Sequence, residues 1–395
     1  MDSSPPPRAR ALGVPFDGTP GRWNAITDVP GVEVGHVTLV RGEGPLEVGV
    51  GPVRTGVSAV LPLGQDGVGR ACPAGLFSLN GNGELTGSHW IAETGGLSSP
   101  VMLTNTHAVG SVHRGVVDWT VEHRPDLAVQ WLLPVVGETW DGYLNDINGG
   151  HVAPEHARAA IDAASSGPVG EGSVGGGTGM VCYGWSGGVG TSSRVVGLGS
   201  RRHVVGAYVQ ANFGDRGELR LAGVPLGDLP VPNPIHEPGW FLRDYERAGG
   251  DAERSDAGPG GAGSVIVLVA TDAPMLPAQC AALARRVSLG LARSGTTGSH
   301  FSGDIFLAWS TAGAGGLDSR IPLGAADAVP YHQLDFLPWG RMDAFYAATV
   351  QAVEESVANA LVVNRDKTGR DGNWVPALPH QMVVERLSAR GVRQA

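Results

Sequence analysis

One junction in the chain constrains the fold more than any other feature of the sequence. A stretch rich in glycine and small polar residues, 249–263, runs directly into Ser264 and then into an unbroken apolar run, residues 265–270. The glycine-rich segment is expected to order poorly because of its composition, whereas an apolar run of this length predicts a strand that is covered on both faces. The sequence therefore predicts a buried strand that begins just after Ser264 and needs a layer of structure on each side.

The same junction could be a site of self-cleavage. Glycine tolerates strained backbone angles and would let the Ser264 hydroxyl approach the carbonyl of Gly263, as an N-to-O acyl shift requires. Hydrolysis of the resulting ester would leave Ser264 as a new N-terminus, with a nucleophilic hydroxyl and its own amine as a possible base. An ordinary loop before a core strand has the same pattern, so the junction alone leaves both interpretations open.

Composition narrows the class of partner. The chain of 395 residues carries a net charge of −10, and its Lys and Arg residues form no run, which argues against nucleic acid as the main partner. No stretch approaches the roughly eighteen apolar residues of a membrane-spanning helix. The first eight residues contain no apolar segment of the kind that a signal peptide needs. We expect a soluble cytoplasmic protein that binds a small partner.

Neither a metal site nor a cofactor site is indicated. The three cysteines, Cys72, Cys182 and Cys280, are far apart and form no CxxC pair, so they are expected to be small core residues. The histidines include no HExxH motif. The glycine-rich run 172–180 fits no phosphate-binding motif, and its glycines indicate places where two backbones, or a backbone and a substrate, come close.

Short apolar runs separated by Gly and Pro predict strands, and longer periodic runs predict helices. The predicted strands include 32–37, 55–61, 101–103 and 128–136. The predicted helices are 154–164, a helix capped by Asp272 that runs to Gly295, and a helix that opens at Asp343 and runs to Leu361. The last two have an apolar face at helical spacing and are expected to pack on a sheet.

Three groups of polar residues lie near the ends of predicted strands. Ser302 and Asp304 stand two positions apart at a strand entrance, which places a hydroxyl and a carboxylate on one face. Asn212 ends a strand and could donate a hydrogen bond to a developing oxyanion. The acidic segment 138–146 follows a buried strand and could hold a cationic amine. Each pattern also fits an ordinary turn, so the residues alone leave both interpretations open.

Motifs in a shared order identify a family resemblance. They include Gly263-Ser264, the segment that begins at Glu138, and residues 13–21, 24–32, 80–84, 104–107, 175–177, 211–214, 270–274 and 302–306. With these motifs the sequence resembles the DmpA-like L-aminopeptidase/D-esterase and β-peptidyl aminopeptidase family over nearly the entire chain. Members of that family look like N-terminal-nucleophile hydrolases that mature by self-cleavage before a serine.

The resemblance implies a role for each candidate residue. Ser264 would be the nucleophile, and its freed α-amine, with a reference pKa of about 7.7 to 8.0, would accept the proton. Ser302 and Asp304 would orient and polarise that pair. Asn212 would help to form the oxyanion hole, and Glu138 would bind the free amino group of the substrate.

Two positions depart from the family pattern. Family members often carry Tyr, with an oxyanion role, where Trp140 stands, and Trp140 can supply only its indole N–H. Trp140 is therefore a substrate-binding candidate. Relatives that cleave β-peptides tend to have Glu where Asp304 stands, and the shorter carboxylate leaves the choice between α- and β-residues open.

The resemblance also implies the architecture. We expect a four-layer αββα sandwich of the type shared with ornithine acetyltransferases, cut into a large fragment, 1–263, and a small fragment, 264–395, that form one interleaved domain. The expected protein is a self-processing aminopeptidase that hydrolyses amides, esters and short peptides with a free N-terminus, needs no cofactor and assembles as a tetramer of cleaved heterodimers. An acyltransferase of the ornithine acetyltransferase type and a non-enzymatic amino acid or peptide binder remain alternatives.

Overall fold

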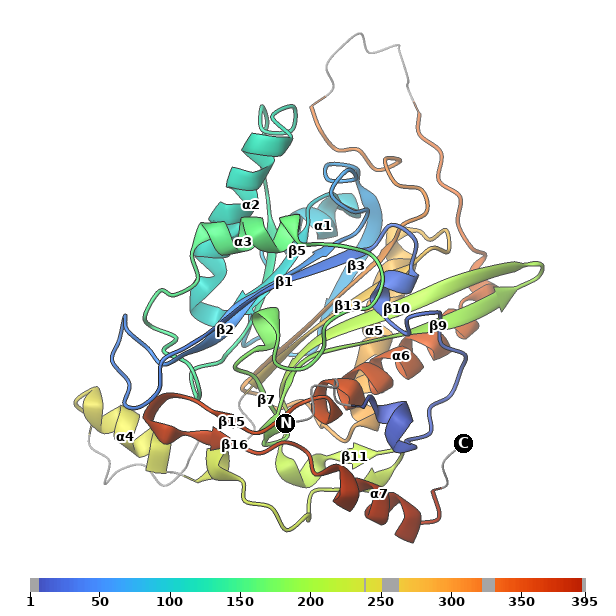
Figure 1. The fold of residues 1–395 in the computed structure, drawn as a ribbon. Helices are drawn as coiled ribbons and strands as arrows, with labels where there is room; N and C mark the ends of the chain where they lie inside the picture. The colour runs from blue at the N-terminus through green and yellow to red at the C-terminus, as the bar shows by residue number, and fades with distance from the viewer. Residues whose placement is uncertain (1–6, 238, 251–262, 322–330, 393–395) are drawn as a thin grey trace.

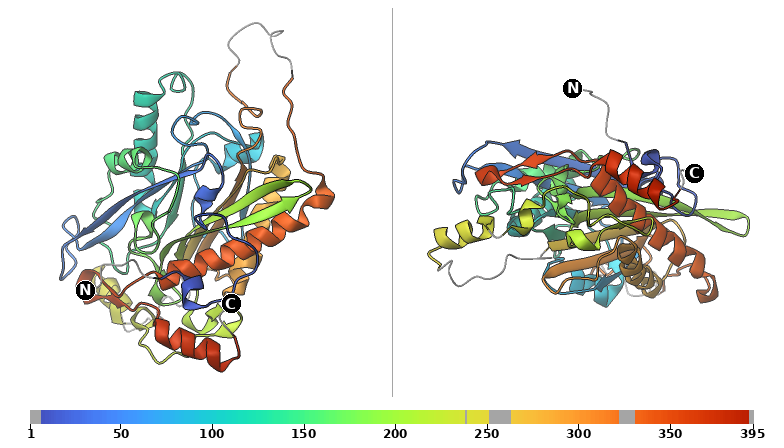
Figure 2. Two further views of the ribbon diagram at one scale, coloured as in Figure 1. Left: turned by 45° about the vertical axis from the view of Figure 1, so that its right-hand side comes forward. Right: turned by 90° about the horizontal axis from the view of Figure 1, so that it is seen from below.

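Two β-sheets face each other, and helices cover the outer face of each sheet (Figures 1 and 2). The structure is a computed structural model that describes residues 7–237, 239–250, 263–321 and 331–392. Most of the glycine-rich stretch predicted to order poorly, residues 251–262, lies outside the described residues. Within the described ranges, no helix is both long and apolar enough to cross a membrane.

The first sheet has four strands and the second has six, with the orders β1-β2-β5-β6 and β4-β3-β14-β13-β10-β9. The first contains β1 (Glu33–Arg41), β2 (Val53–Leu61), β5 (Val101–Asn105) and β6 (Val135–Thr139). The second contains β3 (Cys72–Ser78), β4 (Gly96–Leu97), β9 (Gly188–Leu198), β10 (Arg201–Asn212), β13 (Gly263–Thr271) and β14 (Ser302–Ser310). Three hairpins are formed by β7 (Val181–Cys182) with β8 (Trp185–Ser186), β11 (Arg220–Leu221) with β12 (Val224–Pro225), and β15 (Lys367–Thr368) with β16 (Trp374–Val375).

Helices form the two outer layers. The first sheet is covered by α2 (Val109–His123) and α3 (Pro154–Asp162), and the second by α5 (Pro277–Arg293) and α6 (Asp343–Val362). The other α-helices in the described ranges are α1 (Ser88–Thr94), α4 (Gly239–Arg247) and α7 (His380–Ala389). One apolar cluster, which includes Leu103 and Ile266, lies between the sheets, and two others join each sheet to its helices. The predicted αββα sandwich is confirmed.

The predicted buried strand is β13, and every one of its residues is buried. It runs antiparallel to β10 and parallel to β14, so it lies inside the second sheet and not at its edge. The register places Asn212 opposite Ser264 on one side and Gly303 beside Ser264 on the other. The candidate nucleophile is therefore held by strand pairing on both sides.

Most predicted elements are present, and two predictions were wrong in part. Residues 128–134 form turns and irregular chain, and β6 begins only at Val135. The apolar side chains of Val129, Trp131 and Leu133 line a cavity at the surface instead of the core, so their hydrophobicity does not indicate a buried strand.

Asp272 does not cap the helix that follows it. The helix α5 begins at Pro277, with Leu276 as the capping residue. The Asp272 carboxylate instead accepts a hydrogen bond of 2.7 Å from the backbone N–H of Val204, which joins the end of β13 to β10. The prediction failed because the partner of this carboxylate comes from another strand and not from its own sequence neighbourhood.

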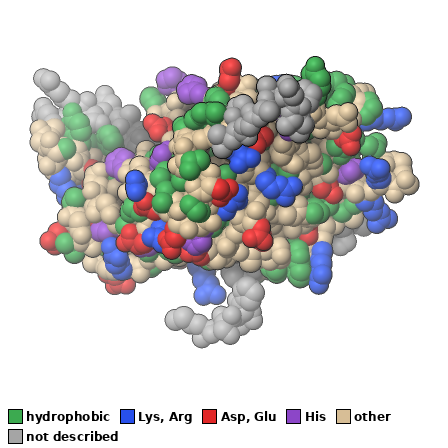
Figure 3. Space-filling view, turned by 90° about the horizontal axis from the view of Figure 1, so that it is seen from above, with side chains coloured by type: hydrophobic (Ala, Val, Ile, Leu, Met, Phe, Trp, Pro, Cys, Tyr) green, Lys and Arg blue, Asp and Glu red, His purple; other side chains and the backbone are tan. Residues whose placement is uncertain are grey.

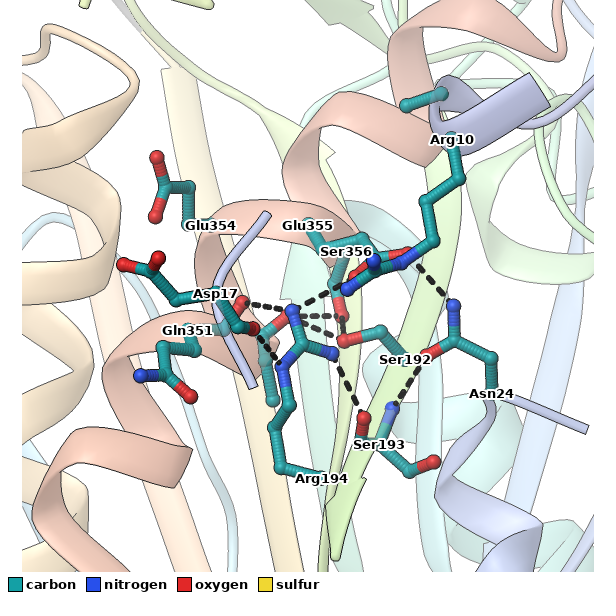
Figure 4. Close-up of polar contacts among 12 residues, drawn as sticks. Arg10, Asp17, Asn24, Ser192, Ser193, Arg194, Gln351, Glu354, Glu355 and Ser356 are labelled. Atoms are coloured by element: carbon teal, nitrogen blue, oxygen red, sulfur yellow. Dashed lines mark hydrogen bonds and ion pairs between the residues drawn. The ribbon is translucent and has the colours of Figure 1, made fainter. Parts of the chain in front are cut away.

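A buried ion pair fixes the helical layer to the second sheet and to the N-terminal segment (Figure 4). Arg194 of β9 and Glu355 of α6 are each 1% exposed, and their side chains are 2.7 Å apart. Glu355 also accepts hydrogen bonds from Arg10 at 2.8 Å and from Asn24 at 2.6 Å. Because an unpaired buried charge is costly, these contacts hold strand, helix and N-terminal segment in one arrangement.

The distribution of charged side chains on the surface and the burial of the cysteines agree with what the composition predicted. On the face seen from above in Figure 3, Lys and Arg side chains are scattered among Asp and Glu and form no large basic patch. All three cysteines are buried and free, as expected of small core residues.

Candidate active site

Ser264 lies near the start of β13, where the second sheet meets a cavity. Its Oγ donates a hydrogen bond of 2.8 Å to the carbonyl oxygen of Gly263 and accepts one of 3.3 Å from the backbone N–H of Gly303. The residue is buried. The hydroxyl therefore lies against the carbonyl group that an N-to-O acyl shift would attack.

The backbone beside Ser264 requires glycine at two positions. A Cβ at Gly263 would overlap the carbonyl oxygen of Asn212, and a Cβ at Gly303 would overlap that of Asn82. Any side chain at either position would push neighbouring segments apart. Glycine therefore allows the close backbone approach that surrounds the Ser264 hydroxyl.

Asn212 is the last residue of β10 and shares a sheet face with Ser264, because the two residues are directly opposite in the antiparallel pair. Its Oδ1 accepts a hydrogen bond of 2.8 Å from the backbone N–H of Val181. This contact fixes the orientation of the amide and leaves Nδ2 as the donor for a ligand in the cavity that Asn212 lines. The geometry suits a donor to an oxyanion.

Ser302 and Asp304 share a face of β14, as their spacing predicts. The Ser302 Oγ donates a hydrogen bond of 2.5 Å to Oδ1 of Asp304, and Asn80 donates one of 2.9 Å to Oδ2. Burial raises the pKa of the Asp304 carboxyl, while hydrogen bonds from Ser302, Asn80 and the Val265 backbone act in the opposite direction. The pair is thus well ordered and close to the main chain of β13.

This pair does not face the Ser264 hydroxyl. Strand register pairs Ser264 with Gly303, so the side chains of Ser302 and Asp304 point to the opposite face of the sheet. Neither of them lines the cavity that Ser264 lines. Their position beside the backbone of residues 263–265 suits an action on the Ser264 nitrogen better than a direct action on Oγ.

Glu138, in β6, is a buried carboxylate in the same cavity as Ser264. Its Oε1 accepts a hydrogen bond of 3.0 Å from the backbone N–H of Glu84, and its Oε2 accepts one from the Thr106 hydroxyl. Burial raises the pKa of Glu138, and these two hydrogen bonds oppose that effect. A buried carboxylate with uncharged donors is suited to receive a cation from a ligand.

The rest of the acidic segment has structural partners. The Asp141 carboxylate accepts a hydrogen bond of 2.9 Å from Asn145, and burial raises its pKa to about 7. The Asp146 carboxylate lies 2.8 Å from the His151 ring. Among the charged residues of this segment, only Glu138 lines the cavity.

The cavity has a volume of about 400 Å³ and brings together five of the predicted site residues, namely Gly263, Ser264, Asn212, Glu138 and Trp140. Asn82, Thr106 and Asp244 are further polar residues of its lining. Tyr143, Trp240 and Phe241 stand with Trp140 on an aromatic side. A reactive hydroxyl, an amide donor, an anionic site and an apolar surface therefore share one space.

Sequence reasoning missed three residues that support the site. Asn80 and Thr106 bind the carboxylates of Asp304 and Glu138, and both belong to motifs of the family resemblance to which no role was given. Lys367 donates to the carbonyl oxygens of Thr178, Met180 and Gly187 at 3.1–3.2 Å, and burial lowers its pKa to about 7. It holds the turn that presents Val181 to Asn212, and a lone lysine gives no sequence signal for such a role.

The glycine-rich run brings backbones together, as expected. A Cβ at Gly176 would lie 2.6 Å from the carbonyl oxygen of Leu103, and Gly179 lines the cavity. In the part of the chain that the structure describes, no group of three or more His, Cys, Asp or Glu residues could hold a metal ion.

Comparison with solved structures defines the fold class of this protein, and comparison with family models defines its family. The structure superposes on the L-aminopeptidase D-Ala-esterase/amidase from Ochrobactrum anthropi, described as a prototype for the serine aminopeptidases and a variant of the Ntn hydrolase fold, with a TM-score of 0.85 and 41% identity over 98% of this chain and 100% of that chain. This is an N-terminal-nucleophile hydrolase fold. The model of peptidase family S58 matches residues 24–375, and the chain belongs to that family.

Two relatives carry the same name, beta-peptidyl aminopeptidase BapA. The protein from Sphingosinicella microcystinivorans is 47% identical over 374 residues, which are 95% of this chain and 90% of that protein. The protein from Sphingosinicella xenopeptidilytica is 44% identical over 392 residues, which are 98% of this chain and 92% of that protein. The family predicted from the sequence motifs is confirmed.

Proposed function

We propose that this protein is a self-processing serine aminopeptidase that hydrolyses amides, esters and short peptides with a free N-terminal amine. The observation that carries the proposal is a single cavity that holds the hydroxyl of Ser264, the amide of Asn212 and the carboxylate of Glu138. Membership of peptidase family S58 and the names of the relatives support it.

Self-cleavage would begin with the Ser264 hydroxyl, which already contacts the Gly263 carbonyl oxygen. Attack of Oγ on the carbonyl carbon forms a C–O bond, the hydroxyl proton passes to the nitrogen, and rupture of the C–N bond leaves an ester and a free α-amine. Water then hydrolyses the ester, so that Gly263 ends one chain as a carboxylate and Ser264 begins the other. The products are fragments 1–263 and 264–395.

Turnover would use the groups that cleavage sets free. The Ser264 amine, placed beside Ser302 and Asp304, accepts the proton of Oγ while Oγ attacks the substrate carbonyl. Asn212 donates to the oxyanion, and Glu138 pairs with the substrate ammonium. Departure of the amine or alcohol leaves an acyl-enzyme, which water hydrolyses to the free acid. These steps would require a free N-terminus on the substrate.

We extend the proposal to assembly and location, for which the family resemblance is the support. The two fragments would form a heterodimer, four heterodimers would form a tetramer, and the assembly would reside in the cytoplasm. Light scattering on a cleaved preparation tests the assembly, and a mass of one heterodimer would contradict it.

The function is tested with purified protein and amino acid p-nitroanilides. Hydrolysis predicts release of p-nitroaniline without any added amine, from a preparation that mass spectrometry resolves into two fragments. Release only after addition of an acceptor amine would identify an acyltransferase instead. An active preparation that contains a single uncut chain would contradict the assigned nucleophile.

A further inference from the structure

Part of the cavity lining is built from rings, next to the carboxylates of Glu138 and Asp244. Four side chains, Trp140, Tyr143, Trp240 and Phe241, form an aromatic wall. The Trp240 ring centroid lies 6.1 Å from that of Trp140, 5.1 Å from that of Tyr143 and 5.8 Å from that of Phe241. Trp240 is therefore the centre of the wall, and its indole N–H donates a hydrogen bond of 2.8 Å to the carbonyl oxygen of Ile235.

The wall is aligned with the group that binds the substrate amine. Glu138 lies in β6, Trp140 directly follows the last residue of that strand, and both residues line the cavity. Thr139 between them points elsewhere and donates to the sulfur of Met180. A substrate whose ammonium pairs with Glu138, and whose carbonyl meets Ser264, must therefore place its own side chain close to Trp140.

Two parts of the wall are held by one hairpin of the small fragment. Arg370, between β15 and β16, forms an ion pair with Asp244 of α4 and donates a hydrogen bond of 2.7 Å to the carbonyl of Gly142. Asn373 binds both the carbonyl of Tyr143, at 2.8 Å, and Arg243 of α4, at 2.9 Å. Figure 1 shows α4 and this hairpin side by side at the lower left. The wall is thus fixed before a ligand arrives.

We propose that the aromatic wall binds the side chain of the N-terminal residue of the substrate and selects large apolar side chains, aromatic ones above all, over small ones. This inference rests on the proposed function. Trp140 is 36% exposed, so part of its ring is open to contact. Burying an aromatic ring against other rings gains the hydrophobic free energy and a further stacking contribution that a methyl group lacks.

The test measures kcat/KM of the cleaved protein for p-nitroanilides that differ only in the N-terminal side chain, from alanine to leucine, phenylalanine and tryptophan. We expect at least a tenfold preference for phenylalanine or tryptophan over alanine, the order of magnitude of side-chain discrimination in apolar pockets. Trp240→Ala should lower kcat/KM for the aromatic substrates about tenfold and change that for alanine by about twofold or less. Trp240→Phe should retain most of the preference.

Matched controls separate the wall from general damage. Trp131→Ala removes an indole that lines another cavity, and it should leave the preference unchanged. Phe241→Ala gives a second probe of the wall if Trp240→Ala fails to fold, and mass spectrometry verifies that each variant is still cleaved. An alanine preference in the wild type, or equal losses for alanine and phenylalanine in a cleaved Trp240→Ala or Phe241→Ala protein, would overturn the inference.

The two proposals fail in different ways. If the wild-type protein hydrolyses neither these anilides nor their β-amino acid counterparts, the proposed function is wrong. If it hydrolyses them without regard to side-chain size, the function stands and the role of the aromatic wall is wrong. A wall variant can also be compared on substrates that share one N-terminal residue and differ in the leaving group. If the variant changes the preference among leaving groups and not the preference among N-terminal residues, the wall lies on the leaving-group side and the inference is overturned.

Discussion

The two sides of the cavity are built by different means. On the reactive side, Ser264, Gly303 and Asn212 belong to β13, β14 and β10, and backbone pairing in the interior of a sheet fixes them. On the aromatic side, Trp240 and Phe241 belong to a short helix, α4, that charged side chains hold against a hairpin. Strand pairing hardly responds to salt or to a single side chain, whereas charged contacts at the surface do. The proposed chemistry and the proposed selection of the substrate should therefore respond to different changes.

The largest expected effect lies on the reactive side. Ser264→Ala should leave the chain uncut and lower hydrolysis by at least about 10³-fold, since the variant lacks the attacking oxygen for both reactions. Mass spectrometry and p-nitroanilide hydrolysis measure the two losses. Ser98→Ala, an exposed serine in another loop, is the control and should be cut normally. Two fragments in the Ser264→Ala protein would mean that another group cuts the chain.

Glu138→Gln should raise KM for substrates with a free amine and lower their kcat/KM about 100-fold, because it removes the charge that pairs with the ammonium. N-acylated substrates should lose much less. Since burial raises the pKa of Glu138, its carboxyl takes up a proton at a higher pH than an exposed glutamate. In the wild type, KM for free-amine substrates should therefore rise as pH falls through this pKa, and the variant should not show that rise. Equal losses for both kinds of substrate would remove the role of Glu138.

Away from the cavity, Arg194→Met tests how much a fully buried ion pair contributes. It leaves Glu355 buried with one guanidinium fewer and should lower the free energy of unfolding by about 3 kcal/mol. Arg158→Met breaks the exposed pair with Glu122 and should cost less than about 1 kcal/mol. Urea unfolding of both variants, made in the uncut Ser264→Ala chain, measures the difference. Equal losses would show that burial does not distinguish these pairs.

A smaller effect is expected where α4 meets the hairpin. Arg247 is about half exposed and binds Asp371 at 2.8 Å, so Arg247→Gln should lower kcat/KM for a phenylalanine anilide by only about 2- to 3-fold. Raising the salt concentration to about 1 M should act in the same direction, since it screens exposed charges. The alanine anilide is the internal control. A loss of the same size for alanine would show that α4 also supports the reactive side.

Chelation should have no effect on either side of the cavity. Every group that the proposed mechanism uses comes from the chain itself, so EDTA should leave both cleavage and hydrolysis unchanged. Inhibition that zinc reverses would contradict the metal-free mechanism.

Sequence alone predicted those segments whose local residue pattern matches the element that they form in the fold. The apolar run after Ser264 became β13, and the helical period after Asp343 became α6. The i, i+2 spacing of Ser302 and Asp304 correctly placed both on one face. It did not reveal that this face is turned away from the Ser264 hydroxyl, because strand register depends on the neighbouring strand and not on the segment itself.

The rest could not be predicted because its partners are distant in sequence. Nothing near Trp240 indicates that its helix completes a cavity with Trp140, and Arg370 joins them from a third segment. For residues 128–134 the sequence predicted a buried strand that is absent. Apolar side chains that line a surface cavity have the same sequence pattern as those of a core strand. Both failures reflect contacts that local propensity does not contain.

The strand order of the second sheet has a consequence for the cut protein. If the chain is cut before Ser264, as proposed, β14 and all of β13 from Ser264 onward belong to the small fragment and lie between β3 and β10 of the large one. After cleavage, neither fragment can leave without exposing two rows of backbone hydrogen-bonding groups and an apolar layer to water. An uncut chain would refold as one molecule, whereas a cut and denatured protein would have to reunite two polypeptides, so its recovery should become slower on dilution. Cleavage would thus exchange reversible folding for resistance to dissociation, which is a kinetic form of stability.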